Sequence, residues 1–401
     1  MASEAAAPHW RRNQAAVTTA TFMGFTGFTL VMPFLPLYFG QLGIRDTATI
    51  AVWSGVSLGV TPAITAAMAP VWARLADRFG RKMMVARSLL SFVVIMGLMA
   101  FVTAPWQVFV LRAIQGLFAG YGPIALAMAA ESAPPEQMAS AIGWVQTAQR
   151  LGPALGPVIG GALAQTLGLR QSFVVSAGVY FAAFLLVLVG YRETAARSAT
   201  RLEPQPAPIT FRQIRAYPHF LLFMGAVFGL QMVDRSLGPI LPLYLSEIGF
   251  GADRVPFLAG VLFTITAAAA AVGNQASRWL LSRRRTEEVV PVMSIVAAVA
   301  ALVFSVAGPW TMLVVVAVGF GFAIGVATTS IYTATTQHVP ADARGVAFAY
   351  LSSAYLVGLA VSPVASGLIG AFSMRAVFLV DAVALGIVAW TVRRGMASAS
   401  N

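Results

Sequence analysis

The stretch that decides the fold is PFLPLYFGQLG, residues 33–43, because it returns as PILPLYLSEIG at residues 239–249. The two copies lie 206 residues apart, which is close to half of a chain of 401 residues. Two further pairs follow in the same order: APWQVFVL at 104–111 with GPWTMLVV at 308–315, offset by 204, and GPALGPVIGG at 152–161 with GLAVSPVASG at 358–367, offset by 206. Matches in one order at nearly one offset predict a duplicated chain with two similar halves.

The composition is typical of an integral membrane protein. Hydrophobic residues make up 58% of the chain and charged residues only 10%, with a mean hydropathy of +0.79. An ordinary soluble domain is about a quarter charged, so this chain has too few charges to cover a surface that faces water. The net charge of +12 does not indicate a nucleic-acid partner, because most of the basic residues fall in short loops between apolar runs.

Apolar runs between polar or Gly/Pro breaks predict twelve transmembrane helices. They cover residues 15–39, 50–73, 84–103, 106–130, 138–164, 171–191, 217–245, 255–277, 289–306, 310–332, 344–370 and 375–392. The first run is too long for the core of a signal peptide, so we expect it to remain as a helix. An even number of spans places both termini on one side, and the arginine-rich loops predict that this side is cytoplasmic.

The repeat divides the chain into two six-helix halves, residues 1–191 and residues 217–401, joined by a cytoplasmic linker at residues 192–216. The predicted fold class is therefore an all-α membrane protein with two pseudo-symmetric halves. Parallel repeats of six spans are the layout of transporters that bind substrate between the halves, although a channel or a membrane enzyme can also be duplicated. The chain has no Cys and three scattered His. We therefore expect no metal, no cofactor and no enzymatic activity.

Four short motifs lie on the predicted spans. Span 1 carries GFTLVMPFLP at 27–36, the loop after span 2 carries ARLADRFGRK at 73–82, span 4 carries LRAIQG at 111–116, and span 5 carries GPALGPVIGG at 152–161. Together these residues resemble the Major Facilitator Superfamily, specifically its 12-helix drug:proton antiporters, over essentially the whole chain. Ala73 replaces the first glycine of the loop motif. The resemblance implies a proton-coupled exporter that works by alternating access.

The span-5 motif places three glycines on one face of a helix. Gly152, Gly156 and Gly160 are spaced by four residues, so a neighbouring backbone can approach this face closely. Pro157 removes an amide and bends the helix, and Gly161 completes the motif. The residues alone leave generic small-residue packing as an equal alternative. The resemblance favours a seal or pivot between the two halves.

Polar side chains interrupt three of the predicted spans. An arginine at the bilayer centre costs about 2.5–3.5 kcal/mol, so each one should face a partner or a wet cavity. We predict that the substrate cavity is lined by Arg112 and Gln115 in span 4, by Gln146, Gln149 and Arg150 in span 5, and by Gln231, Asp234 and Arg235 in span 7. The alternative is fixed pairing between helices that only holds the fold together.

Proton coupling needs a carboxylate whose protonation depends on which side of the membrane is open. We predict that Asp234 is this group, with Arg112 and Glu131 as further candidates, because burial and a nearby arginine act on its proton affinity in opposite directions. When deprotonated, Asp234 is expected to pair with Arg150 or Arg112. Asp381, early in span 12, is expected to be a packing or capping acid.

Charges around the loop between spans 2 and 3 form a separate group. The resemblance implies a conformational latch that holds the N-terminal half against span 11 when the protein is open to the outside. Its residues here are Asp77, Arg78, Gly80, Arg81, Lys82, Glu131 and Arg344. Arg344 begins span 11, where the dipole of a helix N-terminus can hold a carboxylate. The alternative is that these charges only set the orientation of the chain in the membrane.

The candidate cavity residues include three arginines and one aspartate, which favours neutral or anionic amphiphiles as substrates. We expect a monomeric, proton-coupled exporter in the inner membrane of a bacterium, with protons, a small molecule and lipid as its partners and no nucleic acid. Two alternatives remain open. One is an importer or a narrow sugar or metabolite exporter of the same fold, and the other is a non-transporting scaffold or receptor.

Overall fold

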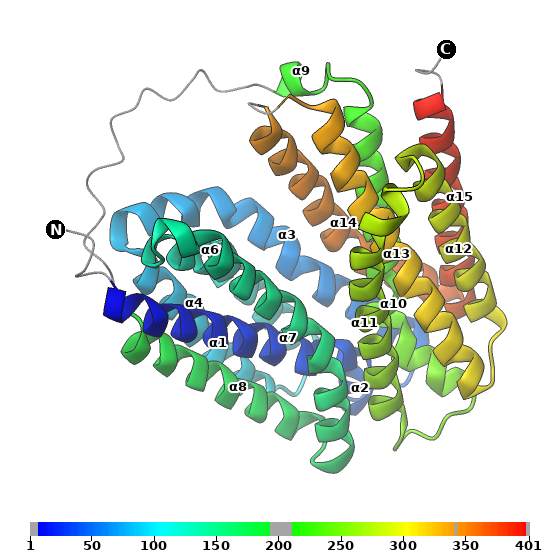
Figure 1. The fold of residues 1–401 in the computed structure, drawn as a ribbon. Coiled ribbons are helices and arrows are strands. Elements are labelled where there is room, and N and C mark those ends of the chain that lie inside the picture. Colours follow the sequence, from blue (N-terminus) through cyan, green and yellow to red (C-terminus); the bar gives the residue numbers. More distant parts are fainter. Residues whose placement is uncertain (1–6, 193–210, 341–342, 398–401) are drawn as a thin grey trace. The chain divides into compact units, whose positions relative to one another are not determined.

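A computed structural model describes residues 7–192, 211–340 and 343–397, and in these ranges the regular structure is helical throughout (Figure 1). The α-helices are α1 (Ala7–Val31), α2 (Leu35–Gln41), α3 (Thr47–Phe79), α4 (Arg81–Met99), α5 (Pro105–Phe118), α6 (Tyr121–Ser132), α7 (Met138–Thr166), α8 (Leu169–Leu185), α9 (Phe211–Ile214), α10 (Phe220–Glu247), α11 (Val255–Leu281), α12 (Thr286–Val306), α13 (Trp310–His338), α14 (Arg344–Phe372) and α15 (Met374–Ala397). Short 3-10 turns at Met32–Phe34 and Pro135–Gln137 and a π-helical segment at Leu186–Gly190 join some of them.

The predicted all-α membrane fold is confirmed. Within the described ranges, 11 helical segments are long and apolar enough to cross a membrane. The other predicted span, 138–164, forms α7, a helix of 29 residues whose glutamines, glycines and prolines lower its hydropathy. The number of twelve spans and the cytoplasmic location of both termini stay predictions.

The chain separates into two compact units. Unit 1 comprises Met1–Phe34 and Ile64–Gln205, and unit 2 comprises Leu35–Ala63 and Pro206–Asn401. The segment Leu35–Ala63 groups with unit 2 because its small residues pack tightly there: a Cβ on Gly59, for example, would lie 2.6 Å from Val364. The predicted division at residues 192–216 stays a prediction, since 193–210 lie outside the described residues.

In unit 1, α1 packs along α7 and α8, and α4 packs on α8 (Figure 1). An aromatic cluster fills the space between these helices. The ring of Phe92 lies 5.2 Å from that of Tyr180 and 6.1 Å from that of Tyr121, and Phe25 lies 5.4 Å from Tyr121. Rings at these separations contribute packing energy beyond the area that they bury.

In unit 2, the closest pairs of helices are α11 with α13, α12 with α15 and α10 with α14. Aromatic side chains again form the core. Phe304 lies 5.5 Å from Phe378 and 6.3 Å from Phe320, and Tyr244 lies 5.0 Å from Phe378. The Tyr244 hydroxyl donates to the carbonyl of Phe304 at 2.6 Å, which gives this buried polar group a partner.

The predicted span 106–130 is not one helix but two, α5 and α6, separated at Ala119–Gly120. Gly120 has a φ of 110°, a left-handed conformation that glycine adopts without steric cost. Pro123 follows in the first turn of α6, where the missing amide would have had no partner within the helix. The break in span 4 therefore has a local sequence cause.

The carbonyl groups that this break frees at the end of α5 are bonded by side chains from other helices. Trp72 Nε1 donates to the carbonyl of Leu117 at 2.7 Å, and Arg87 Nη2 donates to that of Phe118 at 3.2 Å. The Arg87 guanidinium also lies 3.4 Å from the centre of the Trp72 ring. These donors satisfy backbone groups that an unbroken helix would have bonded itself.

Candidate functional site

The glycine face of α7 lies against α1. A Cβ added to Gly152 would lie 2.9 Å from Phe25 Cβ, and one added to Gly156 or Gly160 would collide with Thr29 or with the Leu30 backbone. Thr29 Oγ1 also donates to the carbonyl of Gly152 at 3.3 Å. The two backbones are thus as close as glycine allows.

The rest of the span-5 motif continues in the same helix. Pro157 and Gly161 are both buried, and Pro153 and Pro157 lie inside α7. The α1–α7 contact belongs wholly to unit 1. A role of this seam as a seal between the two predicted halves therefore stays a prediction.

Arg112 lies in the interior of unit 1. Its side chain is only 1% exposed, it donates to Gln115 Oε1, and its guanidinium carbon lies 5.3 Å from the centre of the Phe28 ring. Gln115 Nε2 and the Tyr180 hydroxyl are also buried, and neither has a hydrogen-bond partner among the described residues. This polar cluster is enclosed by aromatic groups within unit 1.

The polar residues of α7 divide into two groups. Gln149 Nε2 donates to the carbonyl of Gly122 at 3.0 Å, which joins α7 to the start of α6. Gln146 and Arg150 are exposed on unit 1. Of the three predicted cavity residues of this helix, Gln146 and Arg150 are therefore accessible, whereas Gln149 is hydrogen-bonded within unit 1.

The corresponding group in unit 2 lies on α10. Arg235 Nε lies 3.1 Å from Asp234 Oδ2, and the two side chains are 45% and 25% exposed. The Tyr355 side chain of α14 forms a hydrogen bond with Arg235. Arg150 and Arg112, the predicted partners of Asp234, belong to unit 1, so that pairing stays a prediction.

Gln231 lies one turn before this ion pair and is 6% exposed. A Cβ on Gly358 of α14 would lie 2.9 Å from Gln231 Cβ, so the two helices approach closely here. The Nε2 atom of Gln231 is buried and lacks a hydrogen-bond partner among the described residues. The α10–α14 contact therefore combines a buried amide with an accessible ion pair.

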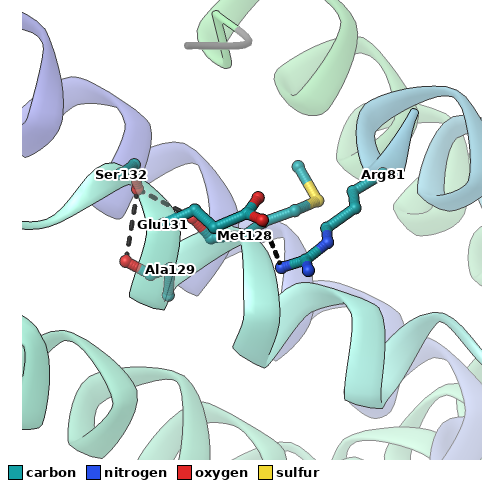
Figure 2. A network of polar contacts seen from close by, with 5 residues as sticks. All are labelled: Arg81, Met128, Ala129, Glu131 and Ser132. Atoms are coloured by element: carbon teal, nitrogen blue, oxygen red, sulfur yellow. Dashed lines mark hydrogen bonds and ion pairs between the residues drawn. The ribbon is translucent and has the colours of Figure 1, made fainter. Parts of the chain in front are cut away.

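Two of the predicted latch residues form an ion pair within unit 1 (Figure 2). Arg81 Nη1 lies 3.0 Å from Glu131 Oε1, which joins the start of α4 to the end of α6. The side chains are 24% and 44% exposed, so this ion pair contributes about 1 kcal/mol or less. Between α3 and α4, Gly80 has a φ of 103°, which only glycine adopts readily.

The other latch residues lie apart from this ion pair. The side chain of Asp77 lies outside the part that the structure describes, and Arg78 is exposed with its guanidinium 5.3 Å from the centre of the Phe79 ring. Lys82 is half-buried. Arg344 Nε donates to the carbonyl of Val339 at 3.1 Å in unit 2. Closure of the latch between unit 1 and span 11 stays a prediction.

Sequence reasoning did not identify Tyr180 or Tyr355 as parts of these clusters, because nothing in their local sequence distinguishes them from core tyrosines. It also missed Trp72 and Arg87 beside the break in span 4. The GYGP stretch at 120–123 was the available signal for that break.

Comparison with known proteins decides the family. The family model of the Major Facilitator Superfamily matches residues 17–305 and 289–398. The chain belongs to the Major Facilitator Superfamily. It is similar to the multidrug resistance protein MdtG of Dickeya zeae (strain Ech586), with 34% identity over 382 residues that cover 93% of this chain and 91% of that protein. MdtG of Enterobacter lignolyticus (strain SCF1) is 30% identical over 96% of this chain and 92% of its own length.

Solved structures agree on the fold. A bacterial homolog of the human lysosomal transporter Spinster, in an inward-facing and unoccupied conformation, has a TM-score of 0.81 at 17% identity and covers 97% of both chains. The nucleoside transporter NupG (D323A mutant) has a TM-score of 0.77 at 15% identity, covering 95% of this chain and 99% of that one. At these identities the likeness concerns the fold alone.

The family resemblance inferred from the motifs is therefore confirmed. The protein is a multi-pass membrane transporter of the bacterial inner membrane with a small-molecule substrate, and it is not an enzyme.

Proposed function

We propose that the protein is a proton-coupled exporter of small amphiphilic compounds, of the multidrug type, that works by alternating access. Two relatives that align with more than nine-tenths of the chain are named multidrug resistance proteins. The exposed Arg150 and Gln146 of α7 are proposed to line the cavity, where a cationic group favours neutral or anionic amphiphiles.

The observation that carries this proposal is the Asp234–Arg235 ion pair in the middle of α10. Asp234 is one-quarter exposed, so a proton can reach it, and its charge is compensated at 3.1 Å. Protonation would remove the attraction that holds Arg235 and leave its hydrogen bond with Tyr355 of α14 as the remaining contact. A proton can thus change how α10 and α14 interact, which is what a coupling group must do.

Three features of unit 1 complete the proposed mechanism. Arg112 is a fixed buried cation that raises the cost of placing a second positive charge nearby, and the Arg81–Glu131 pair is proposed to belong to the conformational latch. The glycine contact between α1 and α7 is proposed to serve as a seal or pivot between the two predicted halves. Both termini are proposed to be cytoplasmic, following the basic loops.

Transport in everted membrane vesicles tests this function. Vesicles that contain the wild-type protein should accumulate fluorescent amphiphiles from a panel of neutral, anionic and cationic dyes while a proton gradient is imposed. Collapse of the gradient with a protonophore should release the dye. Dye accumulation that does not depend on the proton gradient would contradict proton coupling. Failure to transport any dye would favour the narrow exporter, the importer or the non-transporting scaffold.

A further inference from the structure

A single carboxyl group interrupts the buried face of α15. Asp381 is 7% exposed, and Phe378 and Leu385, one turn away on either side, are 1% and 0% exposed. Asp381 lies seven residues after Met374, or about 10 Å into the helix at 1.5 Å per residue. An apolar side chain at this position would continue the buried face. Because an ionisable side chain inside a membrane span is costly, Asp381 is a candidate functional residue.

Asp381 touches one polar group of α10, the hydroxyl of Ser236. The Ser236 Oγ atom lies 2.6 Å from Asp381 Oδ2, and Ser236 is itself 2% exposed. The same Oγ lies 2.9 Å from the carbonyl oxygen of Val233. Ser236 therefore stands between two oxygen atoms at hydrogen-bond distance.

The proton count at Ser236 decides the state of the acid. A serine hydroxyl carries one hydrogen, and a carbonyl oxygen can only accept. If Ser236 donates to Val233, its contact with Asp381 is a hydrogen bond only when Asp381 donates. Both contacts are satisfied together when the carboxyl group is protonated, whereas a carboxylate would leave one of the two as a contact between acceptors.

Within the described ranges, no positively charged side chain of the helices packed around α15 forms an ion pair with Asp381 that would compensate a carboxylate. On α10, Asp234 pairs with Arg235. The other charged groups on α10, α12, α14 and α15 are Glu247, Glu287, Glu288, Arg344, Arg375, Arg393 and Arg394. Among the described residues, the polar group in contact with Asp381 is the Ser236 hydroxyl. A lone carboxylate within the membrane costs about 2.5–3.5 kcal/mol even on the mildest scale, so the neutral acid is favoured.

We propose that Asp381 is a second proton-binding site, neutral in this fold, that holds α15 to α10 through Ser236. Loss of its proton to water leaves a carboxylate that accepts the hydroxyl hydrogen of Ser236, and Ser236 then gives up its bond to Val233. The change occurs one residue after Arg235, so the second site acts on the helix that carries the proposed coupling carboxylate. The proposal does not depend on whether Asp234 performs the coupling.

Infrared spectroscopy of the purified full-length protein at neutral pH is the direct test. The spectrum of wild type minus that of Asp381→Asn should contain the C=O stretch of a protonated carboxyl. Ser236→Ala should keep this band but shift it, because the hydrogen-bond partner is gone. Asp253→Asn, which changes an exposed acid beside Arg254, is the matched control and should leave the band unchanged.

Thermal unfolding gives a second readout that needs no substrate. A carboxyl that is neutral when folded and ionised when unfolded makes the folded state bind about one more proton, so the stability contributed by this site falls as pH rises. Asp381→Asn should remove that part of the pH dependence. Absence of the carboxyl band, or equal pH dependence in wild type and Asp381→Asn, would overturn the proposal without bearing on transport.

Discussion

The contact of α1 with α7 in unit 1 and the contact of α10 with α14 in unit 2 are copies of one another at an offset of 206 residues. Gly152 meets the carbonyl of Phe22 where Gly358 meets that of Phe228. Further along, Gly156 meets the carbonyl of Thr26, and its counterpart Ser362 donates to the carbonyl of Met232. Each pair of helices keeps the same register, but glycine in unit 1 is replaced by serine in unit 2.

The facing helices differ in the same way. Phe28 and Thr29 of α1 occupy the positions at which α10 has Asp234 and Arg235. Phe28 packs under Arg112 and Thr29 packs into the glycine face, whereas Asp234 and Arg235 form an accessible ion pair. One copy of the contact is thus steric and the other is polar and ionisable. This difference supports the proposal that proton-dependent chemistry belongs to the α10–α14 contact.

The largest effect is expected when the serine of unit 2 is placed in unit 1. Gly160→Ser should destabilise the protein by about 1–3 kcal/mol, because the new Cβ meets the Leu30 backbone and neither helix can give way. Thermal unfolding in detergent measures this. Gly143→Ser, on the same helix but with nothing within 4 Å of its Cβ, is the control and should be nearly neutral. Equal losses in both variants would show that the α1–α7 contact is not sterically limited.

Gly156→Ser should have a somewhat smaller effect that a second substitution relieves. Its Cβ meets mainly the Thr29 side chain, which can be shortened, unlike the backbone that faces Gly160. Combining it with Thr29→Ala should recover part of the lost unfolding free energy, and a double-mutant cycle measures the coupling. Strictly additive losses would mean that Thr29 is not the obstacle.

In unit 2, replacing the serine by glycine should lower the free energy of unfolding only slightly. Ser362→Gly removes one hydrogen bond to the Met232 carbonyl, and interhelical bonds of this kind contribute about 1 kcal/mol or less in membranes. The loss of unfolding free energy should therefore be well below that of Gly160→Ser. A loss as large as in unit 1 would erase the distinction between a steric and a polar contact.

The smallest effect concerns Asn13 of α1 and its counterpart His219, the residue before α10. Asn13 of α1 exchanges hydrogen bonds with the Arg192 backbone, whereas its counterpart His219 packs against His338 with ring centres 5.5 Å apart. Burial, and then the charge of His338, lowers the pKa of His219. The unfolded chain then binds more protons between that lowered pKa and about 6.5, so stability declines as pH falls through this window.

Replacing His219 by asparagine, the residue found at the corresponding position of unit 1, tests this pH dependence of stability. His219→Asn should flatten the acid side of the unfolding temperature profile, because asparagine does not titrate and tolerates the φ of 62° found at this position. An unchanged profile would place the acid sensitivity elsewhere.

Much of this architecture was predictable because it depends on amino-acid composition and on the order of apolar runs and motifs along the chain. The repeat at 33–43 and 239–249, the apolar runs and the four motifs sufficed for the fold class and the family. The break at Gly120 was missed although the local GYGP stretch signals it. The donors that bond the freed carbonyls of Leu117 and Phe118, Trp72 and Arg87, could not be identified because they are distant in sequence.

The same limit applies to the candidate site. The ion pair between the helix neighbours Asp234 and Arg235 was not predicted; the long arginine side chain reaches the carboxylate at 3.1 Å. Side-chain partners such as Tyr355 and the buried state of Arg112 depend on three-dimensional packing, which local sequence does not encode.

The role of Asp234 in proton coupling is tested most directly by proton-driven dye accumulation in everted vesicles that contain Asp234→Asn, with Asp253→Asn as an acid control outside α10. Asp234→Asn is expected to lose gradient-driven accumulation by about tenfold or more, equivalent to about 1.4 kcal/mol of coupling, while Asp253→Asn behaves as wild type. Full gradient-driven accumulation in Asp234→Asn, at equal protein levels, would contradict the assignment of proton coupling to the α10–α14 contact.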